Sequence, residues 1–522
     1  MAVQRKTILR ILTFALLLFT IVVGALQWKA QDVVKDFLSR KIPDHLKVSY
    51  SELNVNVVLG NVDFEQLSLK IFNRDTTLAH TVFKTEKLEL QGLDYYQLFF
   101  QNTIKLDEFI LQAPSLHYYS SKYYPAKTRS DKGFVNLLKT ILVARLQVKN
   151  GSFHLMEKKE DSVKIAVDSY DFTLLGGKTD PVLVKDKIPL TFDDYALKAK
   201  NVFVNLGEFE TLKTAIIAVS PSNSEIKDIS LTSKYDKEEL SKHLTKERDY
   251  IQLHIPKVKV DGLDFGFHKD RFGIRVSYGE LVDPNLEMYR DKRLHDDFNL
   301  KPLYGKLLRD LPLDLDIEKW IITNGYISYE EKVVDGHDAG KLFFEDVNAS
   351  FNHISNTGGP ERTTMINVNT KISGKGKLDF DWSFNINDPS DAFTVSGSLK
   401  NLKTEELNSF LEPNLRARAE GTIDEMYFTF GGGPSVAKGD IKMKYRDFKF
   451  DVLDKDRLKI NKFLTFIGNI FIDDGSKADA QGFRYGTIEA EREINKSFFN
   501  YLWAGIREGI ISTLTGSGKE RE

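Results

Sequence analysis

The sequence contains no cysteine, and this absence excludes several classes of protein. None of its 522 residues offers a thiol for a disulfide scaffold, a zinc ribbon, an iron–sulfur cluster or a nucleophilic cysteine site. Proline is scarce as well, at 14 residues, where the average usage of about 5% would give roughly twice as many. There is also no surplus of charge of either sign, because 73 Lys and Arg stand against 75 Asp and Glu. The basic excess of a bulk nucleic-acid binder is therefore missing, and we expect no nucleic-acid partner.

What the chain does contain points to ordered, strand-rich structure. Hydrophobic residues make up 41% and charged residues 28% of the sequence, a balance that excludes disorder of the whole chain. Phenylalanine and tyrosine are abundant, at 36 and 20 residues, and aromatic residues favour β-strands.

The N-terminus has the pattern of a membrane anchor. An apolar run follows Arg5, Lys6 and Arg10, includes Phe14 and Leu18, and ends near Trp28. Residues 8–28 are long enough to cross the bilayer, since about 20 residues at 1.5 Å each match a hydrocarbon core of ~30 Å.

The flanking residues of this run predict its orientation. The basic residues precede it, so residues 1–7 form a cytoplasmic tip, Trp28 lies at the far interface, and the body is exported. We expect a single-pass membrane protein with an exported body, and an exported body without cysteine is consistent with a bacterial periplasm because it needs no oxidative folding. A cleaved signal peptide is the alternative, because Val23, Gly24 and Ala25 are small enough for a cleavage site.

Beyond residue 50 the hydrophobic residues recur with a period of two. The pattern is clearest over residues 364–453, where Phe380, Trp382 and Phe384 alternate with Asp381 and Ser383. Strict alternation is typical of strands with one apolar and one wetted face, and short turn-rich spacers favour antiparallel neighbours. We therefore predict a mainly β protein with short helices: an elongated, twisted antiparallel sheet or groove built of repeated strand units and preceded by one transmembrane helix.

The expected organisation follows the order of these patterns. After the span we place an N-terminal β region with short helices at residues 29–300 and a C-terminal β domain at residues 301–472. Residues 473–522 are expected to form a hairpin and an amphipathic helix, because apolar residues recur at helical spacing over residues 494–514.

Two pairs of segments resemble each other and indicate a repeat. LQVKNGSFHLMEKK (146–159) and KWIITNGYISYEEK (319–332) share a strand, an Asn-Gly pair and a second strand. LDEFILQAPSLHYY (106–119) and SYGELVDPNLEMYR (277–290) share the same layout with a proline in place of Asn-Gly. Repeats of this kind predict a stacked architecture, although unrelated β meanders also look alike.

The order of these segments resembles the AsmA-like family of Gram-negative envelope proteins, whose larger relatives include TamB and YhdP. The resemblance rests on an N-terminal span followed by LNVNVVLGNVDFEQLSLKI (53–71) and KLELQGLDYYQLFFQNTIKLDEFILQAPSLHYY (87–119). LDIEKWIITNGYISYEE and GDIKMKYRDFKFDVL, in the C-terminal half, resemble the shorter, Bacteroidetes-type members. The resemblance implies a long twisted sheet with an apolar groove that guides lipid between membranes.

We take the apolar positions of the cleanest strands as candidate groove-lining residues. Packing in an ordinary sandwich core would equally explain such large side chains, and both interpretations stand at this point. The candidates are Leu378, Phe380, Trp382, Phe384, Ile386, Phe393, Val395, Leu399, Met426, Phe428 and Phe430.

No arrangement of residues predicts a catalytic, metal or cofactor site. The ten histidines are scattered and form no helical metal-binding pair. Asp335, His337 and Asp338 are more typical of a hairpin turn, and Asp473-Asp474-Gly475 lacks the spaced ligands of a calcium loop. We therefore expect a protein that is not an enzyme and that needs no cofactor or metal.

The expected function is binding of membrane phospholipids in the apolar groove, which would assist their transport or the maintenance and assembly of the outer membrane. The alternative is a structural or assembly module with a closed β-sandwich. Such a module would aid outer-membrane protein biogenesis through contacts with an outer-membrane or other envelope protein.

Overall fold

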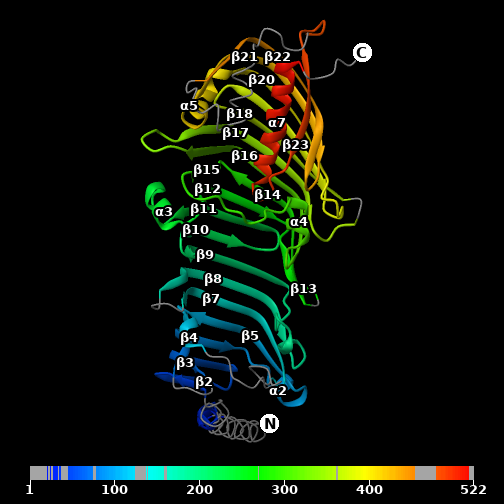
Figure 1. Ribbon diagram of the computed structural model, residues 1–522. Coiled ribbons are helices and arrows are strands. Elements are labelled where there is room, and N and C mark those ends of the chain that lie inside the picture. Colours follow the sequence, from blue (N-terminus) through cyan, green and yellow to red (C-terminus); the bar gives the residue numbers. More distant parts are fainter. Residues whose placement is uncertain are drawn as a thin grey trace, which may run out of the picture. The chain divides into compact units, whose positions relative to one another are not determined.

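A computed structural model describes most of the chain as a mainly β protein (Figure 1). The chain divides into two compact units, residues 1–206 with 213–221, and residues 207–212 with 222–522. This division falls earlier in the chain than the expected boundary between residues 300 and 301. The described residues are 20, 24, 27–32, 34–36, 45–73, 78–123, 137, 139–157, 162–268, 270–359, 362–452 and 478–516.

Most of the expected membrane span lies outside these residues, including Arg5, Lys6, Arg10, Phe14 and Leu18. Within the described part of the chain, no helix is both long enough and apolar enough to cross a membrane. The anchor thus stays a prediction from the sequence.

The first unit is built of large, mostly antiparallel sheet. From β3 onward each strand pairs with the next, except that β4 and β7 each pair with both β5 and β6. Its elements are β1 (Leu46–Ser49), β2 (Glu52–Asn56), β3 (Asn61–Phe72), β4 (Ala79–Gln91), α2 (Tyr95–Phe100), β5 (Thr103–Gln112), β6 (Ser115–Tyr119), η1 (Ser120–Lys122), β7 (Thr140–Met156), β8 (Val163–Thr179), η2 (Leu183–Lys185) and β9 (Asp194–Asn205), with β10 (Glu210–Val219) spanning the division.

The second unit also consists of twisted, mostly antiparallel sheet, with a long C-terminal helix. From β16 to β23 each strand pairs antiparallel with the next. Its elements are β11 (Asn223–Ser233), α3 (Lys237–His243), β12 (Asp249–Asp261), β13 (Asp264–His268), β14 (Arg271–Val282), β15 (Asn285–Asp291), α4 (Tyr304–Arg309), β16 (Asp314–Lys332), β17 (Gly340–Ser355), β18 (Thr363–Ile372), β19 (Gly376–Asn385), β20 (Phe393–Lys403), η3 (Thr404–Leu407), α5 (Asn408–Leu415), β21 (Ala417–Gly432), β22 (Val436–Val452), β23 (Arg484–Glu491) and α7 (Phe498–Thr515).

The expectation of consecutive antiparallel strands is confirmed for β18 to β22 but is wrong at two places. In the first unit, β5 and β6 both run parallel to β7. In the second unit, β14 and β15 both run parallel to β16. A connection of about twenty residues precedes β7 and β16, and it is long enough for each strand to run parallel to the strand before it.

The two sets of parallel pairings, β5 and β6 with β7 and β14 and β15 with β16, are formed by the two copies of the repeat seen in the sequence. In each copy a strand pair interrupted by proline lies beside a long strand that contains Asn-Gly. Pro114 accepts a hydrogen bond from the amide of Ser152 at 2.7 Å, and Pro284 accepts one from Tyr326 at 2.8 Å. The backbone pairing is therefore the same in both copies, down to the hydrogen bond at the proline.

The Asn-Gly pairs do not end a strand, as the sequence suggested, but form β-bulges within one long strand. Asn150 in β7 and Asn324 in β16 both have φ of 54°, a left-handed conformation that asparagine tolerates better than most residues. The pairing of β7 with β8 and of β16 with β17 shifts register on both sides of the following glycine. A bulge bends its strand and re-aims the side chains that follow.

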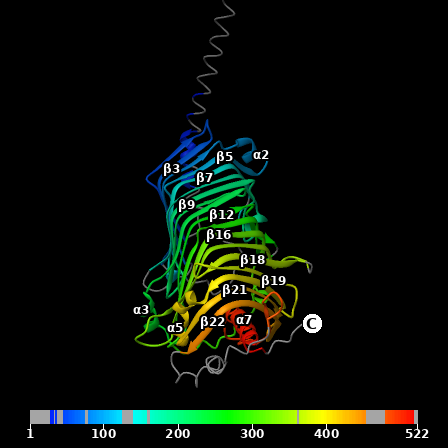
Figure 2. The same ribbon diagram turned by 90° about the horizontal axis from the view of Figure 1, so that it is seen from above.

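The helix expected near residues 494–514 forms as α7 and covers one face of the second unit, where the strands curve around it (Figure 2). Its N-cap is Ser497, whose side chain accepts a hydrogen bond from the amide of Asn500. Glycine allows α7 to approach the sheet closely, because a Cβ at Gly509 would lie 2.8 Å from side-chain carbons of both Ile441 and Ile488.

Replacing Gly509 with leucine is expected to destabilise the second unit. The added side chain would overpack the contact with β22 and β23, and overpacking costs about 1–3 kcal/mol. Asn500→Leu places the same leucine side chain at an exposed position of α7 and should change stability by less than about 0.5 kcal/mol. Urea unfolding followed by tryptophan fluorescence measures both variants. Equal stability of the two would contradict the close packing.

Candidate functional site

The sequence-predicted groove residues gather at one place in the second unit, where α7 covers them. Nine of them are at most 8% exposed: Trp382, Phe384, Ile386, Phe393, Val395, Leu399, Met426, Phe428 and Phe430. Leu378 and Phe380 are half-buried and pack against the same cluster. Ile386 is buried nearby but is not a member of the cluster.

Aromatic stacking joins this patch to the helix. Trp382 stacks on Phe498 with 4.5 Å between ring centroids, and Phe393 meets Phe498 and Tyr501 edge-on at 5.0 and 5.7 Å. The burial and these contacts are those of a protein core. The part of the apolar face that was clearest in the sequence is thus occupied by the chain's own helix.

The first unit carries an apolar face of its own, which we call the first-unit apolar face. Cross-strand partners lie on the same side of a sheet, so the strand pairing defines rows of side chains. On one side of the mid-strand bulges, one row is Phe64, Leu88, Leu111, Val148, Phe172 and Leu197, and the next is Val62, Leu90, Phe109, Leu146, Leu174 and Tyr195.

Two further rows follow on the other side of the bulges. They are Leu69, Phe83, Leu116, Phe153, Val167 and Val202, and Ile71, Thr81, Tyr118, Leu155, Ile165 and Val204. Leu67 lies two positions from Leu69, on the same side of β3, and packs in the same hydrophobic cluster as Phe64. The apolar side chains before and after the irregularity in β3 therefore lie on one face of the sheet. Thr81 is the single polar member of the four rows.

A left-handed residue inside the strand accounts for this continuity. In β3 the apolar positions change from even to odd numbers between Phe64 and Leu67, and Gln66 between them has φ of 49°. Asn201 does the same in β9, with φ of 50°. Each irregularity lets apolar residues on both of its sides contribute to one face.

The first-unit apolar face is only partly covered. Phe64, Val148 and Leu174 are buried, whereas most other members of the rows are only half-buried. Among the described helices, residues 27–32 and 34–36 cover the β2–β3 end through Ala30 and Val34. α2 contacts β5, and η1 contacts β4 and β7.

The second unit has an apolar row that starts open and ends covered. It runs from Val260 through Gly279, Trp320, Phe351, Ile366, Trp382 and Val395 to Phe430. Trp320 and Phe351 are half-buried, whereas Val395 and Phe430 are at most 1% exposed. The ring of Trp320 lies against Gly279, where a side chain would collide with it.

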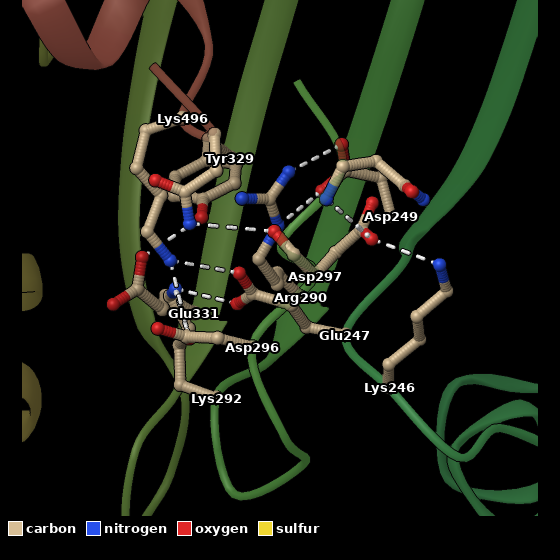
Figure 3. A network of polar contacts seen from close by, with 12 residues as sticks. Lys246, Glu247, Asp249, Arg290, Lys292, Asp296, Asp297, Tyr329, Glu331 and Lys496 are labelled. Atoms are coloured by element: carbon tan, nitrogen blue, oxygen red, sulfur yellow. Dashed lines mark hydrogen bonds and ion pairs between the residues drawn. The ribbon is translucent and has the colours of Figure 1, made fainter. Parts of the chain in front are cut away.

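A charged network lies at neighbouring ends of β12, β15 and β16 (Figure 3). Asp249, Arg290 and Glu331 are cross-strand partners on three neighbouring strands. Each lies two residues along its strand from an apolar or aromatic residue on the same side of the sheet, namely Ile251, Met288 and Tyr329. Arg290 donates two hydrogen bonds to Asp249, at 2.6 and 2.7 Å. Burial tends to lower the pKa of Arg290, but the Asp249 carboxylate outweighs burial and raises it.

Glu247 is the buried carboxylate of this network, at 6% exposure. Lys292 lies 2.5 Å and Lys496 3.0 Å from its two oxygens. Burial alone would raise the pKa of Glu247, but the two ammonium groups outweigh it and lower the pKa to about 2. Since Lys496 directly precedes the N-cap of α7, the network ties the start of the covering helix to the sheet.

Other polar groups of the described residues pair with one another or lie on the wetted face of the sheet. Asp335 pairs with Arg293, and His337 contacts Arg416 at 2.8 Å. A depression of about 580 Å³ lies on the polar face of β16 to β19, where Asp379 and Asp381 accept hydrogen bonds from Asn369 and Asn367. No group of residues suited to holding a metal occurs among the described residues, and Asp473-Asp474 lies outside them.

The comparisons with known proteins add no relative. No protein-family model matches the chain, and no curated protein matches it. The likeness to AsmA-like proteins thus remains an expectation from the sequence.

The pKa of Glu247 predicts how stability responds to acid. Its folded pKa lies below the ordinary 4.5, so its contribution is fully present above pH 4.5 and is lost as the pH falls toward about 2. At neutral pH that contribution is on the order of 2 kcal/mol. Glu247→Gln should lower the free energy of unfolding at neutral pH. The variant should also lose less of that free energy than the wild type as the pH falls from neutral toward 2.

Urea unfolding as a function of pH tests this prediction. Glu331→Gln is a control variant, because its carboxylate belongs to the same network and accepts a hydrogen bond from Tyr329 at 2.8 Å, yet it is not the group held by two lysines. A wild-type acid profile that Glu247→Gln leaves unchanged would contradict the ion-pair account.

Proposed function

We propose that this protein is anchored in the inner membrane by residues 8–28 and binds phospholipid acyl chains on the first-unit apolar face in the periplasm. By holding lipid there it would assist phospholipid transport or the maintenance and assembly of the outer membrane. The observation that carries the proposal is the set of four apolar rows across β3 to β9, most of whose members stay half-exposed.

The size of this face is the first argument. Monomeric soluble proteins rarely leave contiguous apolar patches of more than a few hundred Å² in water. Four rows across six strands of sheet spaced by about 4.8 Å exceed that limit. Something must therefore cover the face, and the described helices of this unit reach only its edges.

The second argument is a comparison within the chain. Where α7 covers the sheet, the apolar side chains fall to between 0 and 8% exposed. On the first-unit apolar face, Phe83, Leu116, Phe153 and Leu155 remain only half-buried. The sheet supplies the same kind of surface in both units, but in the first unit it is left for another occupant.

Acyl chains fit this surface chemically. They are flexible and apolar, they need no directional partner, and each CH₂ removed from water contributes about 0.8 kcal/mol. The polar headgroup can stay in water at the strand ends. No titratable group is needed for the step, in keeping with the expectation from the sequence that the protein is not an enzyme.

The second candidate is an assembly module in which an envelope protein, instead of lipid, covers the same face. The core beneath α7 favours this second candidate, because there the apolar face of the sheet is covered by protein. The two candidates differ in what accompanies the purified chain.

Lipid analysis of the purified full chain tests the proposal. Organic extraction and mass spectrometry should find phospholipid bound in excess of the detergent-exchanged background. Phe153→Glu places a charge in the middle of the first-unit apolar face and should lower the bound phospholipid at least several-fold, because an unpaired charge among acyl chains is costly.

Ala196→Glu is the matched control, since it adds the same charge at an exposed position of β9 whose neighbours Tyr195 and Leu197 face the other way. Both variants should keep the circular dichroism spectrum of the wild type. A folded wild-type chain without phospholipid would overturn the proposal, and a co-purifying envelope protein would favour the assembly module.

A buried position gives the contrasting result. Phe428 is 3% exposed beneath α7, so Phe428→Glu would bury an unpaired charge and should destabilise the second unit by several kcal/mol. Thermal unfolding measures this loss. Retained stability in Phe428→Glu would show that this patch is open rather than a core.

A further inference from the structure

Exposed aromatic and aliphatic side chains gather at the N-terminal end of the first unit. They come from helix α2, from the turn that follows β2, and from the helical residues 27–32. Their exposed fractions are Trp28 76%, Val58 66%, Leu59 62%, Tyr95 36%, Tyr96 61%, Phe99 71% and Phe100 75%. We call these seven residues the aromatic patch.

Helix α2 presents its aromatic residues in two ladders. Tyr95 stacks on Phe99 at 6.4 Å and Tyr96 packs on Phe100 at 5.4 Å, each pair at the i, i+4 spacing. The helix is fixed at its start by Asp94, whose side chain accepts a hydrogen bond from the amide of Gln97 at 3.0 Å. Four aromatic rings are thus held toward solvent on a single short helix.

Hydrogen bonds join α2 to the turn after β2. Tyr95 donates from its hydroxyl to the carbonyl of Val57 at 2.8 Å, and the amide of Leu93 donates to Gly60 at 3.0 Å. Gly60 has φ of 68°, and a Cβ there would lie 2.8 Å from the backbone of Leu93. The close approach places Val58 and Leu59 beside the start of α2.

The same turn holds the helix that contains Trp28. The backbone amide of Val57 donates to the side-chain oxygen of Gln27 at 2.9 Å, and the side-chain nitrogen of Gln27 donates to the carbonyl of Val55. Gln31 donates to the carbonyl of Leu53 at 3.2 Å. These bonds satisfy the open edge of β2, so one short stretch of backbone carries all three parts of the aromatic patch.

From this arrangement we infer that the aromatic patch inserts into the headgroup region of the bilayer and seats the first unit on the membrane surface. The apolar run of the sequence ends at Leu26, directly before Gln27, so a span there brings the patch to the interface. Tryptophan and tyrosine are enriched at that depth, where one end of the ring is apolar and the other is wet. The inference rests on the proposed anchor and goes beyond lipid binding by the sheet.

The absence of cysteine makes a direct test practical, because a single introduced cysteine is the only labelling site. Full-length Phe99→Cys carrying a nitroxide is reconstituted into vesicles of phosphatidylethanolamine and phosphatidylglycerol. Collision rates with oxygen, which concentrates in the bilayer, and with a water-soluble nickel chelate give the label's depth. We expect the oxygen-to-nickel ratio at Phe99→Cys to exceed that at Ala196→Cys several-fold, and Phe100→Cys provides a second position in the patch.

Equal ratios at Phe99→Cys and Ala196→Cys would overturn the inference. So would shielding of the label from both reagents, since that result means that a second copy or another protein covers the patch. A label in water together with bound phospholipid would refute membrane docking but not lipid binding. A label in the bilayer without bound phospholipid would leave docking intact and refute the proposed lipid binding.

Discussion

The structure depends on one constraint of extended backbone: successive side chains point to opposite faces, so a strand has a single apolar face only while its register is kept. Long strands that bend cannot keep strict alternation throughout. In this chain a residue in the left-handed conformation, such as Gln66, Asn150 or Asn324, interrupts the alternation in mid-strand. At the same place the apolar positions change from even to odd residue numbers, or from odd to even. Hydrophobic residues on both sides of the irregularity therefore share one face.

That constraint produces apolar surface far beyond the needs of a single core, and the two units use it differently. In the second unit, α7 closes part of the surface with Phe498 and Tyr501, and the charged network around Glu247 fixes the segment that leads into this helix. In the first unit most members of the four rows are only half-buried. The helix α7 thus completes the apolar face of the second unit, whereas the first-unit apolar face is where we propose that acyl chains bind.

Much of the fold could be predicted from the sequence. The strict alternation around Phe380 and Trp382 indicated antiparallel strands, and the spacing after residue 494 indicated the final helix, as found. The repeat was visible as sequence similarity, but not its parallel crossings, because the pairing of distant strands leaves no local pattern. The Asn-Gly pairs suggested strand ends since the same dipeptide makes hairpin turns, and only the partner strand distinguishes a turn from a bulge.

The candidate site was harder to predict for the same reason. Alternation is clearest where no bulge interrupts it, so the sequence drew attention to Phe428 and Phe430, which lie beneath α7. The strands that carry the open rows through Phe83, Phe153 and Val202 change between even and odd apolar positions in mid-strand, so they look irregular as a sequence. Whether a strand face is covered also depends on a helix far along the chain, which local periodicity cannot show.

The central claim is that the first-unit apolar face meets lipid in the cell. Site-specific photo-crosslinking measures this contact directly, with benzoylphenylalanine introduced at Leu155 and, as the control, at the exposed Ala196. The account predicts a phospholipid adduct at Leu155 and none at Ala196. An adduct with protein at Leu155, or no adduct at either position, would contradict it.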